Sequence, residues 1–233
     1  MKIEIWSDIV CPWCYIGKRR LEKAIDDLKY QDKVTIEYKS FQLDPNMETD
    51  TSINIYQYLS EKKGMSIEDA MEIGETVAGV AEDLGLQYNL DKTIPINTLK
   101  AHELIHFAKS KGLQTEAKEA LLSAYFTEGK NLSDLNEIAS IGEKIGLNKV
   151  DILESLQSNY FSKAVKADIK AGNDLGISGV PFFVFNRKFG ISGAQSEDVF
   201  KKTLLKSFQD WEIETKNKLS IIEGESCEIN GDC

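Results

Sequence analysis

Alternating apolar positions predict two strands near the start of the chain. Residues 3–6 read Ile-Glu-Ile-Trp, and residues 34–41 combine the same alternation with β-branched and aromatic side chains. Between them, a helix is predicted to open at Cys11 and Cys14 and to continue as far as Leu28. A strand, a helix and a strand in this order form a parallel crossover unit, which is right-handed as a rule.

From about residue 52 to residue 176, the apolar positions follow helical spacing instead. The clearest helix is predicted at residues 66–84, where Ser66 can cap the first turn together with Asp69, and Gly85 can end the last turn. Further helices are predicted at residues 97–108, 115–127, 134–145 and 159–175. This long middle section indicates a helical insertion.

The strand pattern returns only near the end. Residues 182–185 and 188–192 flank a turn at Asn186 and Arg187, which predicts a hairpin, and an amphipathic helix follows at residues 196–216. The order β-α-β, helices, β-β-α is that of a thioredoxin-like fold with an inserted all-helical domain, an α/β architecture. We predict a thioredoxin-like domain from residues 1–51 and 177–217, a helical insertion domain at 52–176 and an acidic, cysteine-containing tail at 218–233.

Composition and charge exclude some functions. With 233 residues, of which 42% are hydrophobic, the chain can bury a full core. Its formal net charge of -10 would repel phosphate backbones and anionic lipids, so we expect neither nucleic-acid nor membrane binding. No apolar run approaches the ~18 residues that cross a bilayer, and the chain begins without a basic and apolar leader, so we expect a cytoplasmic protein.

Cysteine usage is more informative than composition. The chain has four cysteines: Cys11 and Cys14 near its start, and Cys227 and Cys233 at its end. Four are too few for a disulfide scaffold in a chain of this length, so two close pairs indicate dithiol chemistry or metal binding. A zinc site would need two more ligands beside the first pair, and two buried thiols without a function are the plainer alternative.

A cysteine at the start of a helix is chemically activated. If Cys11 is the N-cap, Pro12 takes the first helical position, and Cys14 lies one turn further on the same face, so the two sulfurs can form a disulfide. Free N–H groups and the helix dipole favour a thiolate at Cys11. We therefore predict Cys11 as an acidic, attacking thiol and Cys14 as the resolving thiol. The pair should be only moderately oxidising, because neither Pro12 nor Trp13 adds a positive charge.

A second signal precedes the strand at residues 182–185. Pro181 follows Gly179 and Val180, and the simplest interpretation is an edge strand that begins with proline. In a thioredoxin-like architecture, however, the proline at this place is cis and faces the dithiol, and the backbone before it is free to pair with an extended substrate. Pro181 is then part of the catalytic site, and Val180 binds substrate.

Two further patterns have competing explanations. Residues 102–106 read His-Glu-Leu-Ile-His and match the zinc-protease motif H-E-x-x-H, but no further ligand signature follows, so we predict no metal site. The terminal pair Cys227 and Cys233 is an inert part of the tail, a local disulfide, or an accessory dithiol that exchanges with the first pair.

Five motifs together carry a family resemblance. They are Ser-Asp-Ile-Val-Cys-Pro-Trp-Cys-Tyr-Ile-Gly-Lys at 7–18, Gly-Val-Pro-Phe-Phe-Val-Phe at 179–185, and supporting segments at 41–45, 97–102 and 190–195. On these motifs the chain resembles, over essentially its whole length, the DsbA family of the thioredoxin superfamily, and within it the cytoplasmic FrnE-like branch. The resemblance implies a thiol-disulfide oxidoreductase or isomerase without a bound cofactor, which acts on protein or small thiol substrates through a mixed disulfide.

The resemblance also assigns roles to residues. It implies that Cys11 attacks, Cys14 resolves and Pro181 is the cis-proline, with Pro12, Trp13 and Val180 next to the substrate. Some FrnE-like proteins carry a second cysteine pair, which favours an accessory redox role for Cys227 and Cys233. We expect glutathione as a candidate redox partner, and a monomer or homodimer. In a reducing cytosol, disulfide reduction, isomerisation or a response to oxidative stress is favoured over bulk oxidation.

The same superfamily branch supplies the alternative function. It includes glutathione-dependent enzymes that resemble 2-hydroxychromene-2-carboxylate isomerase and the kappa-class glutathione transferases, which carry a serine where this chain has Cys11. The presence of both Cys11 and Cys14 favours redox chemistry over isomerisation or conjugation.

Overall fold

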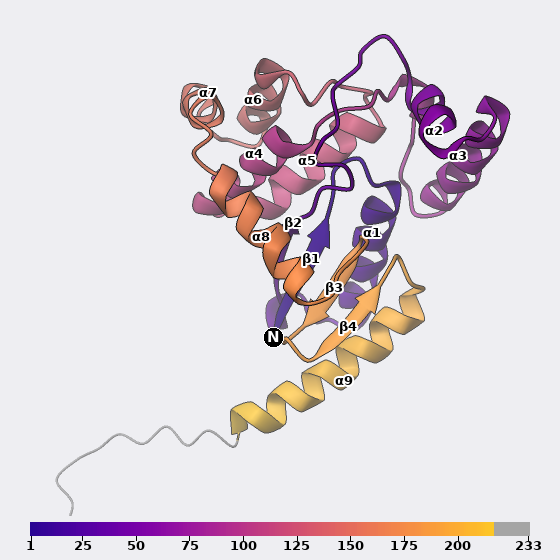
Figure 1. The fold of residues 1–233 in the computed structure, drawn as a ribbon. Helices are drawn as coiled ribbons and strands as arrows, with labels where there is room; N and C mark the ends of the chain where they lie inside the picture. The colour runs from indigo at the N-terminus through magenta and orange to yellow at the C-terminus, as the bar shows by residue number, and fades with distance from the viewer. Residues whose placement is uncertain (217–233) are drawn as a thin grey trace, which may run out of the picture.

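The computed structural model describes residues 1–216 and follows the predicted order of elements (Figure 1). The elements are β1 (Lys2–Ser7), α1 (Pro12–Asp27), β2 (Thr35–Ser40), α2 (Ile55–Lys63), α3 (Ile67–Glu82), α4 (Leu99–Ser110), α5 (Gln114–Phe126), α6 (Leu135–Lys144), α7 (Lys149–Gln157), α8 (Ser162–Asp174), β3 (Phe182–Phe185), β4 (Phe189–Ser192) and α9 (Glu197–Lys216). The tail predicted at 218–233 lies outside the described residues.

The strands form one mixed sheet in the order β2-β1-β3-β4. β1 runs parallel to β2 and antiparallel to β3, with Ile5 opposite Phe183. β3 and β4 form the predicted hairpin, whose turn residues Asn186 and Arg187 have left-handed φ angles of 48° and 59°. With helices inserted between β2 and β3, this arrangement confirms the α/β, thioredoxin-like fold with a helical insertion.

Alternation along β1 divides the buried residues between the two faces of the sheet. Ile3 and Ile5 belong to the large core that also contains side chains of α1 and α9, whereas Trp6 belongs to a small cluster beside α8. The Trp6 indole donates a hydrogen bond to the carbonyl of Asp168 on α8 at 2.9 Å. Gly172 makes this approach possible, because a Cβ there would lie 2.8 Å from Trp6 Nε1.

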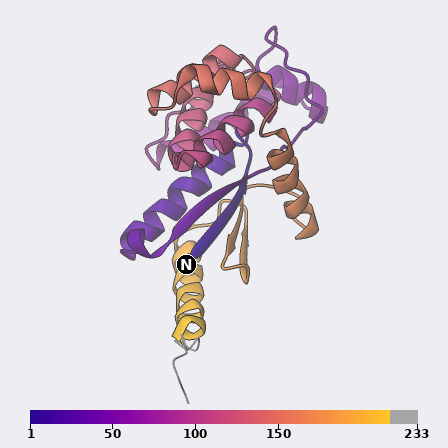
Figure 2. The same ribbon diagram turned by 90° about the vertical axis from the view of Figure 1, so that its left-hand side faces the viewer.

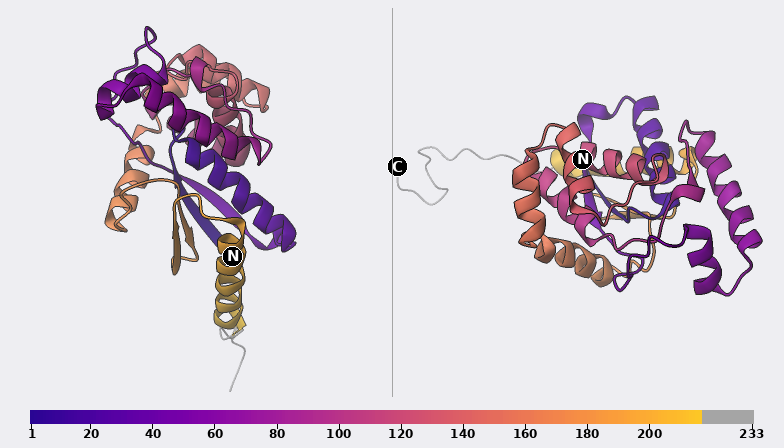
Figure 3. Two further views of the ribbon diagram at one scale, coloured as in Figure 1. Left: turned by 90° about the vertical axis from the view of Figure 1, so that its right-hand side faces the viewer. Right: turned by 90° about the horizontal axis from the view of Figure 1, so that it is seen from above.

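Helices α2 to α7 lie beyond the carboxyl ends of β1 and β2, above the sheet in Figures 1 and 2, whereas α8 lies beside the sheet. In Figure 3, α2 and α3 form a pair to one side of the remaining inserted helices. Ser66 and Asp69 form the predicted reciprocal cap of α3. The helix predicted at 159–175 begins only at Ser162, because the left-handed φ of 54° at Asn159 interrupts helical geometry.

The boundaries at residues 51 and 177 between the two predicted domains stay a prediction. Within residues 1–216, none of the helices combines the length and the apolar character that a membrane crossing requires.

Candidate active site

The two cysteines of the first pair lie at the start of α1. Cys11 is the N-cap, Pro12 follows in the first turn, and the Cys14 amide donates a hydrogen bond to the Cys11 carbonyl at 3.0 Å. Both thiols are free and buried, with Cys11 4% and Cys14 3% exposed. The predicted N-cap geometry of Cys11 and Pro12 is therefore confirmed.

The segment before β3 lies on the other side of the dithiol. The Val180–Pro181 peptide bond is cis, and the Cys11 thiol lies 3.5 Å from the Val180 carbonyl oxygen, to which it donates. Gly17 on α1 allows Pro181 to pack close, because an added Cβ would lie 3.2 Å from the proline Cγ and 3.0 Å from the Phe183 ring. Two segments that are far apart in the sequence thus meet at Cys11.

The residues between the cysteines differ in their surroundings. Trp13 is 39% exposed and lies at the rim of the site, whereas the carbonyl of Pro12 accepts a hydrogen bond from the Tyr88 hydroxyl at 2.8 Å. The Tyr88 ring stacks on Phe126 of α5, with ring centroids 4.7 Å apart. Tyr88 therefore ties the first turn of α1 to the inserted helices. Contact of Pro12, Trp13 and Val180 with substrate stays a prediction.

A buried carboxylate lies directly before the cysteines. Asp8 is 1% exposed; its Oδ1 accepts from the Ile9 amide at 2.7 Å and lies 3.1 Å from Nε2 of His102 on α4. Its Oδ2 accepts from the Leu43 amide at 2.8 Å. Burial alone would raise the pKa of Asp8, but the hydrogen bond and charge of His102, with further hydrogen bonds, bring it below its ordinary value. Asp8 therefore joins the loops after β1 and β2 to α4.

A buried lysine lies beside Ser7, the residue before Asp8. Lys118 on α5 is 1% exposed and donates one long hydrogen bond, 3.4 Å, to the Ser7 carbonyl. Burial lowers the pKa of Lys118 to about 8, although the charges of Cys14, Asp8 and Cys11 oppose this shift. Sequence reasoning missed this residue. Its signal was a lysine on the apolar face of a helix, next to Ala117 and one turn before Leu121 and Leu122.

The two thiols titrate as a pair, so their pKa values belong to the pair and not to either residue alone. At Cys11, the hydrogen bond with Cys14 and burial act to raise the pKa. At Cys14, burial acts to raise the pKa, whereas the hydrogen bond with Cys11 and the charge of Lys118 act to lower it. That Cys11 is the more acidic, attacking thiol stays a prediction.

We expect acid to destabilise the protein through His102. Burial lowers the pKa of His102 despite its hydrogen bond to Asp8, so the unfolded chain binds the proton more tightly than the folded protein. The contribution of His102 is therefore lost as the pH falls from its unfolded value of ~6.5 through its lower folded value. Urea unfolding between about pH 7 and 5 should show a shallower loss in His102→Gln than in the natural protein. Equal pH slopes would contradict this assignment.

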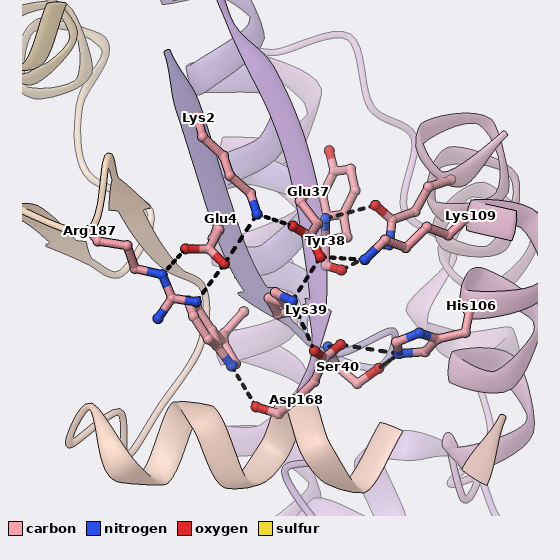
Figure 4. A network of polar contacts seen from close by, with 12 residues as sticks. Lys2, Glu4, Glu37, Tyr38, Lys39, Ser40, His106, Lys109, Asp168 and Arg187 are labelled. Carbon is pink, nitrogen blue, oxygen red and sulfur yellow. Dashed lines mark hydrogen bonds and ion pairs between the residues drawn. The ribbon is translucent and has the colours of Figure 1, made fainter. Parts of the chain in front are cut away.

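The second histidine of the H-E-x-x-H pattern belongs to another network. His106 Nε2 lies 3.2 Å from the Ser40 hydroxyl and 3.1 Å from Asp168 Oδ2, and further ion pairs continue along β2 to Lys39 and Glu37 (Figure 4). One nitrogen faces both the hydroxyl and the carboxylate, so this trio lacks the arrangement of a nucleophile, a base and an orienting acid. The two histidines therefore contact separate carboxylates: His102 joins α4 to the loop after β1, and His106 joins α4 to β2 and α8.

The terminal pair Cys227 and Cys233 lies outside the described residues. Its accessory redox role stays a prediction.

The fold and this site define a thioredoxin-like protein with a buried dithiol at a helix start and a cis-proline segment opposite it. Residues 2–205 match the DSBA-like thioredoxin domain, and the chain belongs to this family. This membership confirms the resemblance to the DsbA family, while assignment to the FrnE-like branch stays a prediction.

Solved structures extend the comparison. A probable DsbA oxidoreductase from Streptomyces coelicolor is 31% identical, with a TM-score of 0.86 over 99% of this chain and 97% of that chain. A 2-hydroxychromene-2-carboxylate isomerase is 15% identical, with a TM-score of 0.63 over 93% and 98%. The cytosolic disulfide reductase DsbM from Pseudomonas aeruginosa, solved with GSH, is 13% identical, with a TM-score of 0.64 over 90% and 100%. The last two similarities show the shared fold alone.

Proposed function

We propose that this protein is a thiol-disulfide oxidoreductase that exchanges disulfides with protein or small thiol substrates through a mixed disulfide at Cys11. The proposal rests on one observation. Cys11 Sγ lies 3.5 Å from the Val180 carbonyl oxygen, beside the cis Pro181, and the second free thiol, Cys14, lies one helical turn away. Membership of the DSBA-like family and similarity to a probable DsbA oxidoreductase support it.

The proposed chemistry starts from the reduced dithiol. Cys11 loses its proton to solvent and attacks one sulfur of a substrate disulfide, and the other substrate sulfur leaves as a thiolate that takes a proton from solvent. Cys14 then loses its proton to solvent and attacks Cys11 Sγ, and the second substrate sulfur leaves as a thiolate that takes a proton in turn. The substrate gains two electrons, and the protein ends as the Cys11–Cys14 disulfide.

The exposed side of the site suits this reaction. Trp13 lies at the rim, and the Val180 backbone lies beside the attacking sulfur, where an extended substrate can pair with it. We propose that the protein works as a reductase or isomerase in the cytoplasm, with glutathione as a candidate partner and oxidative stress as a setting. The solved cytosolic disulfide reductase with GSH supports a role of this kind in the same fold.

The direct test is exchange with a substrate disulfide. The reduced natural protein should reduce insulin or oxidised glutathione, and Cys14→Ser should stop after one step as a mixed disulfide at Cys11, because the resolving sulfur is missing. Mass spectrometry of the Cys11 peptide detects this product. No exchange by the natural protein would contradict the proposal. Glutathione-dependent isomerisation or conjugation that survives Cys14→Ser would instead support the alternative enzyme class.

A further inference from the structure

A pocket of about 250 Å³ lies between α2 and the body of the protein. Its walls come from the loop before α1, the loop after β2, α2 and the segment that leads into α4. The apolar part of the lining includes Val10, Leu43, Met47, Ile55, Leu59 and Ile96. Since an apolar cavity of ~150 Å³ holds benzene, this pocket has room for a group of one or two rings.

Helix α2 turns its apolar face to this pocket. Ile55, Tyr58 and Leu59 fall at helical spacing and line the pocket, yet none of the residues of α2, all of which the structure describes, is buried. On another side, α2 packs on α3, where a Cβ added at Gly74 would lie 2.6 Å from the Tyr56 ring. This pair of helices lies to one side of the other inserted helices (Figure 3). Helix α2 therefore covers the pocket without filling it.

The charged groups of the lining are already paired or exposed. Asp44 accepts from the Tyr58 hydroxyl at 3.2 Å and pairs with Lys62; these three residues also line an adjoining surface hollow, which places them at the rim. Asp8 accepts from two backbone amides and contacts a histidine ring. Lys62 and Lys63 are exposed to solvent. A buried charge without a partner is costly, so the pocket suits an uncharged group.

We propose that this pocket binds the apolar group of a small disulfide or thiol substrate whose sulfur reacts at Cys11. Val10 in the wall directly precedes Cys11, and consecutive Cα atoms are ~3.8 Å apart, so a ring a few bonds from the reacting sulfur reaches the pocket. The contacts of Asp44 join α2 to the loop after β2 across the rim, which favours a small molecule over a polypeptide.

The inference rests on the proposed function for the identification of the ligand as a substrate. Binding of an uncharged ring is independent of exchange and is measured separately. Leu59 on α2 then determines specificity together with the other apolar residues of the wall.

The first test measures binding of indole, an uncharged two-ring probe, to the natural chain. NMR of labelled methyl groups should show ring-current shifts at Val10, Ile55 and Leu59 that saturate at about millimolar indole, the range usual for so small a ligand. Leu205 on α9 is exposed and lies outside the pocket, so its methyl groups serve as the reference. No shifts at the pocket, or equal shifts at Leu205, would overturn the proposal.

The second test measures substrate preference. The rate of oxidation of the reduced protein by dibenzyl disulfide is divided by its rate with bis(2-hydroxyethyl) disulfide, and free dithiothreitol gives the intrinsic ratio. The natural protein should exceed this intrinsic ratio by at least about tenfold, because only the benzyl ring gains from apolar walls. Leu59→Glu places a charge in the pocket and should remove most of the preference. Leu205→Glu, the same change at an exposed position, should keep it.

The outcomes separate the pocket from the oxidoreductase function. Equal preferences in Leu59→Glu and Leu205→Glu would overturn the assignment of a substrate to the pocket. Insulin reduction that falls in Leu59→Glu as much as exchange with dibenzyl disulfide would overturn the assignment to a small molecule. Indole binding at the pocket of a protein that exchanges with no disulfide would refute the proposed function and leave the pocket established as a site for apolar ligands.

Discussion

The Cys11→Ser variant should lose disulfide exchange by at least about a thousandfold, because serine is a far weaker nucleophile and cannot form the mixed disulfide. Serine is close to cysteine in size, and Cys11 is already an N-cap, a position that serine favours, so the fold should persist. Insulin reduction and the mass of the product with oxidised glutathione measure the loss, and circular dichroism checks the fold.

The tail cysteines give the matched control for this experiment. The Cys227→Ser/Cys233→Ser double variant removes two thiols and leaves Cys11 in place, so the first exchange step should keep its rate. A slower overall turnover in this variant would support the accessory dithiol. An active Cys11→Ser protein would show that another residue attacks the substrate, and the proposed mechanism would then be wrong.

The Asp8→Ala variant should lower the free energy of unfolding by about 3 kcal/mol or more, the usual effect of removing one partner from a buried charged network. It leaves the amides of Ile9 and Leu43 and the ring of His102 without their acceptor, and all these contacts are 3.1 Å or shorter. Urea unfolding at neutral pH measures the change.

A second aspartate provides the control for Asp8. Asp44 accepts a hydrogen bond from Tyr58 and pairs with Lys62, but its side chain is 27% exposed, so water can replace these partners. Asp44→Ala should therefore cost less than about 1 kcal/mol. Similar losses from both substitutions would mean that Asp8 does not join the loops after β1 and β2 to α4 in the way that the contacts indicate.

The elements of the fold could be predicted because local patterns encode them. Apolar alternation placed β1, β2 and the β3–β4 hairpin to within a residue or so, and the reciprocal cap of Ser66 and Asp69 placed the start of α3. Where a local signal was absent, the prediction was weaker. The bounds of α2 and α7 were not predicted, and Asn159 was placed inside a helix that begins three residues later, at Ser162.

The dithiol and the Pro181 segment opposite it could also be predicted from the sequence. Two cysteines at helical spacing after a strand, with proline between them, determine which face of α1 the sulfurs share. Pro181 could be singled out because it immediately precedes an apolar strand. The pairing of β1 with β3 then brings it to Cys11. These features depend on spacing along the chain and on strand order, both of which the sequence expresses directly.

The charged surroundings of the dithiol were decided only by tertiary structure. The sequence placed the two cysteines at a helix start and showed no sign of the charged groups that the insertion brings near them. In the folded protein, His102 and Lys118 come from inserted helices about a hundred residues away, and they contact Asp8 and the Ser7 carbonyl directly before the cysteines. The electrostatic effect of a charge depends on distance and burial, and neither is set by position in the chain. The sequence by itself therefore determined the fold and the dithiol, and packing of the insertion decided which charged groups lie beside it.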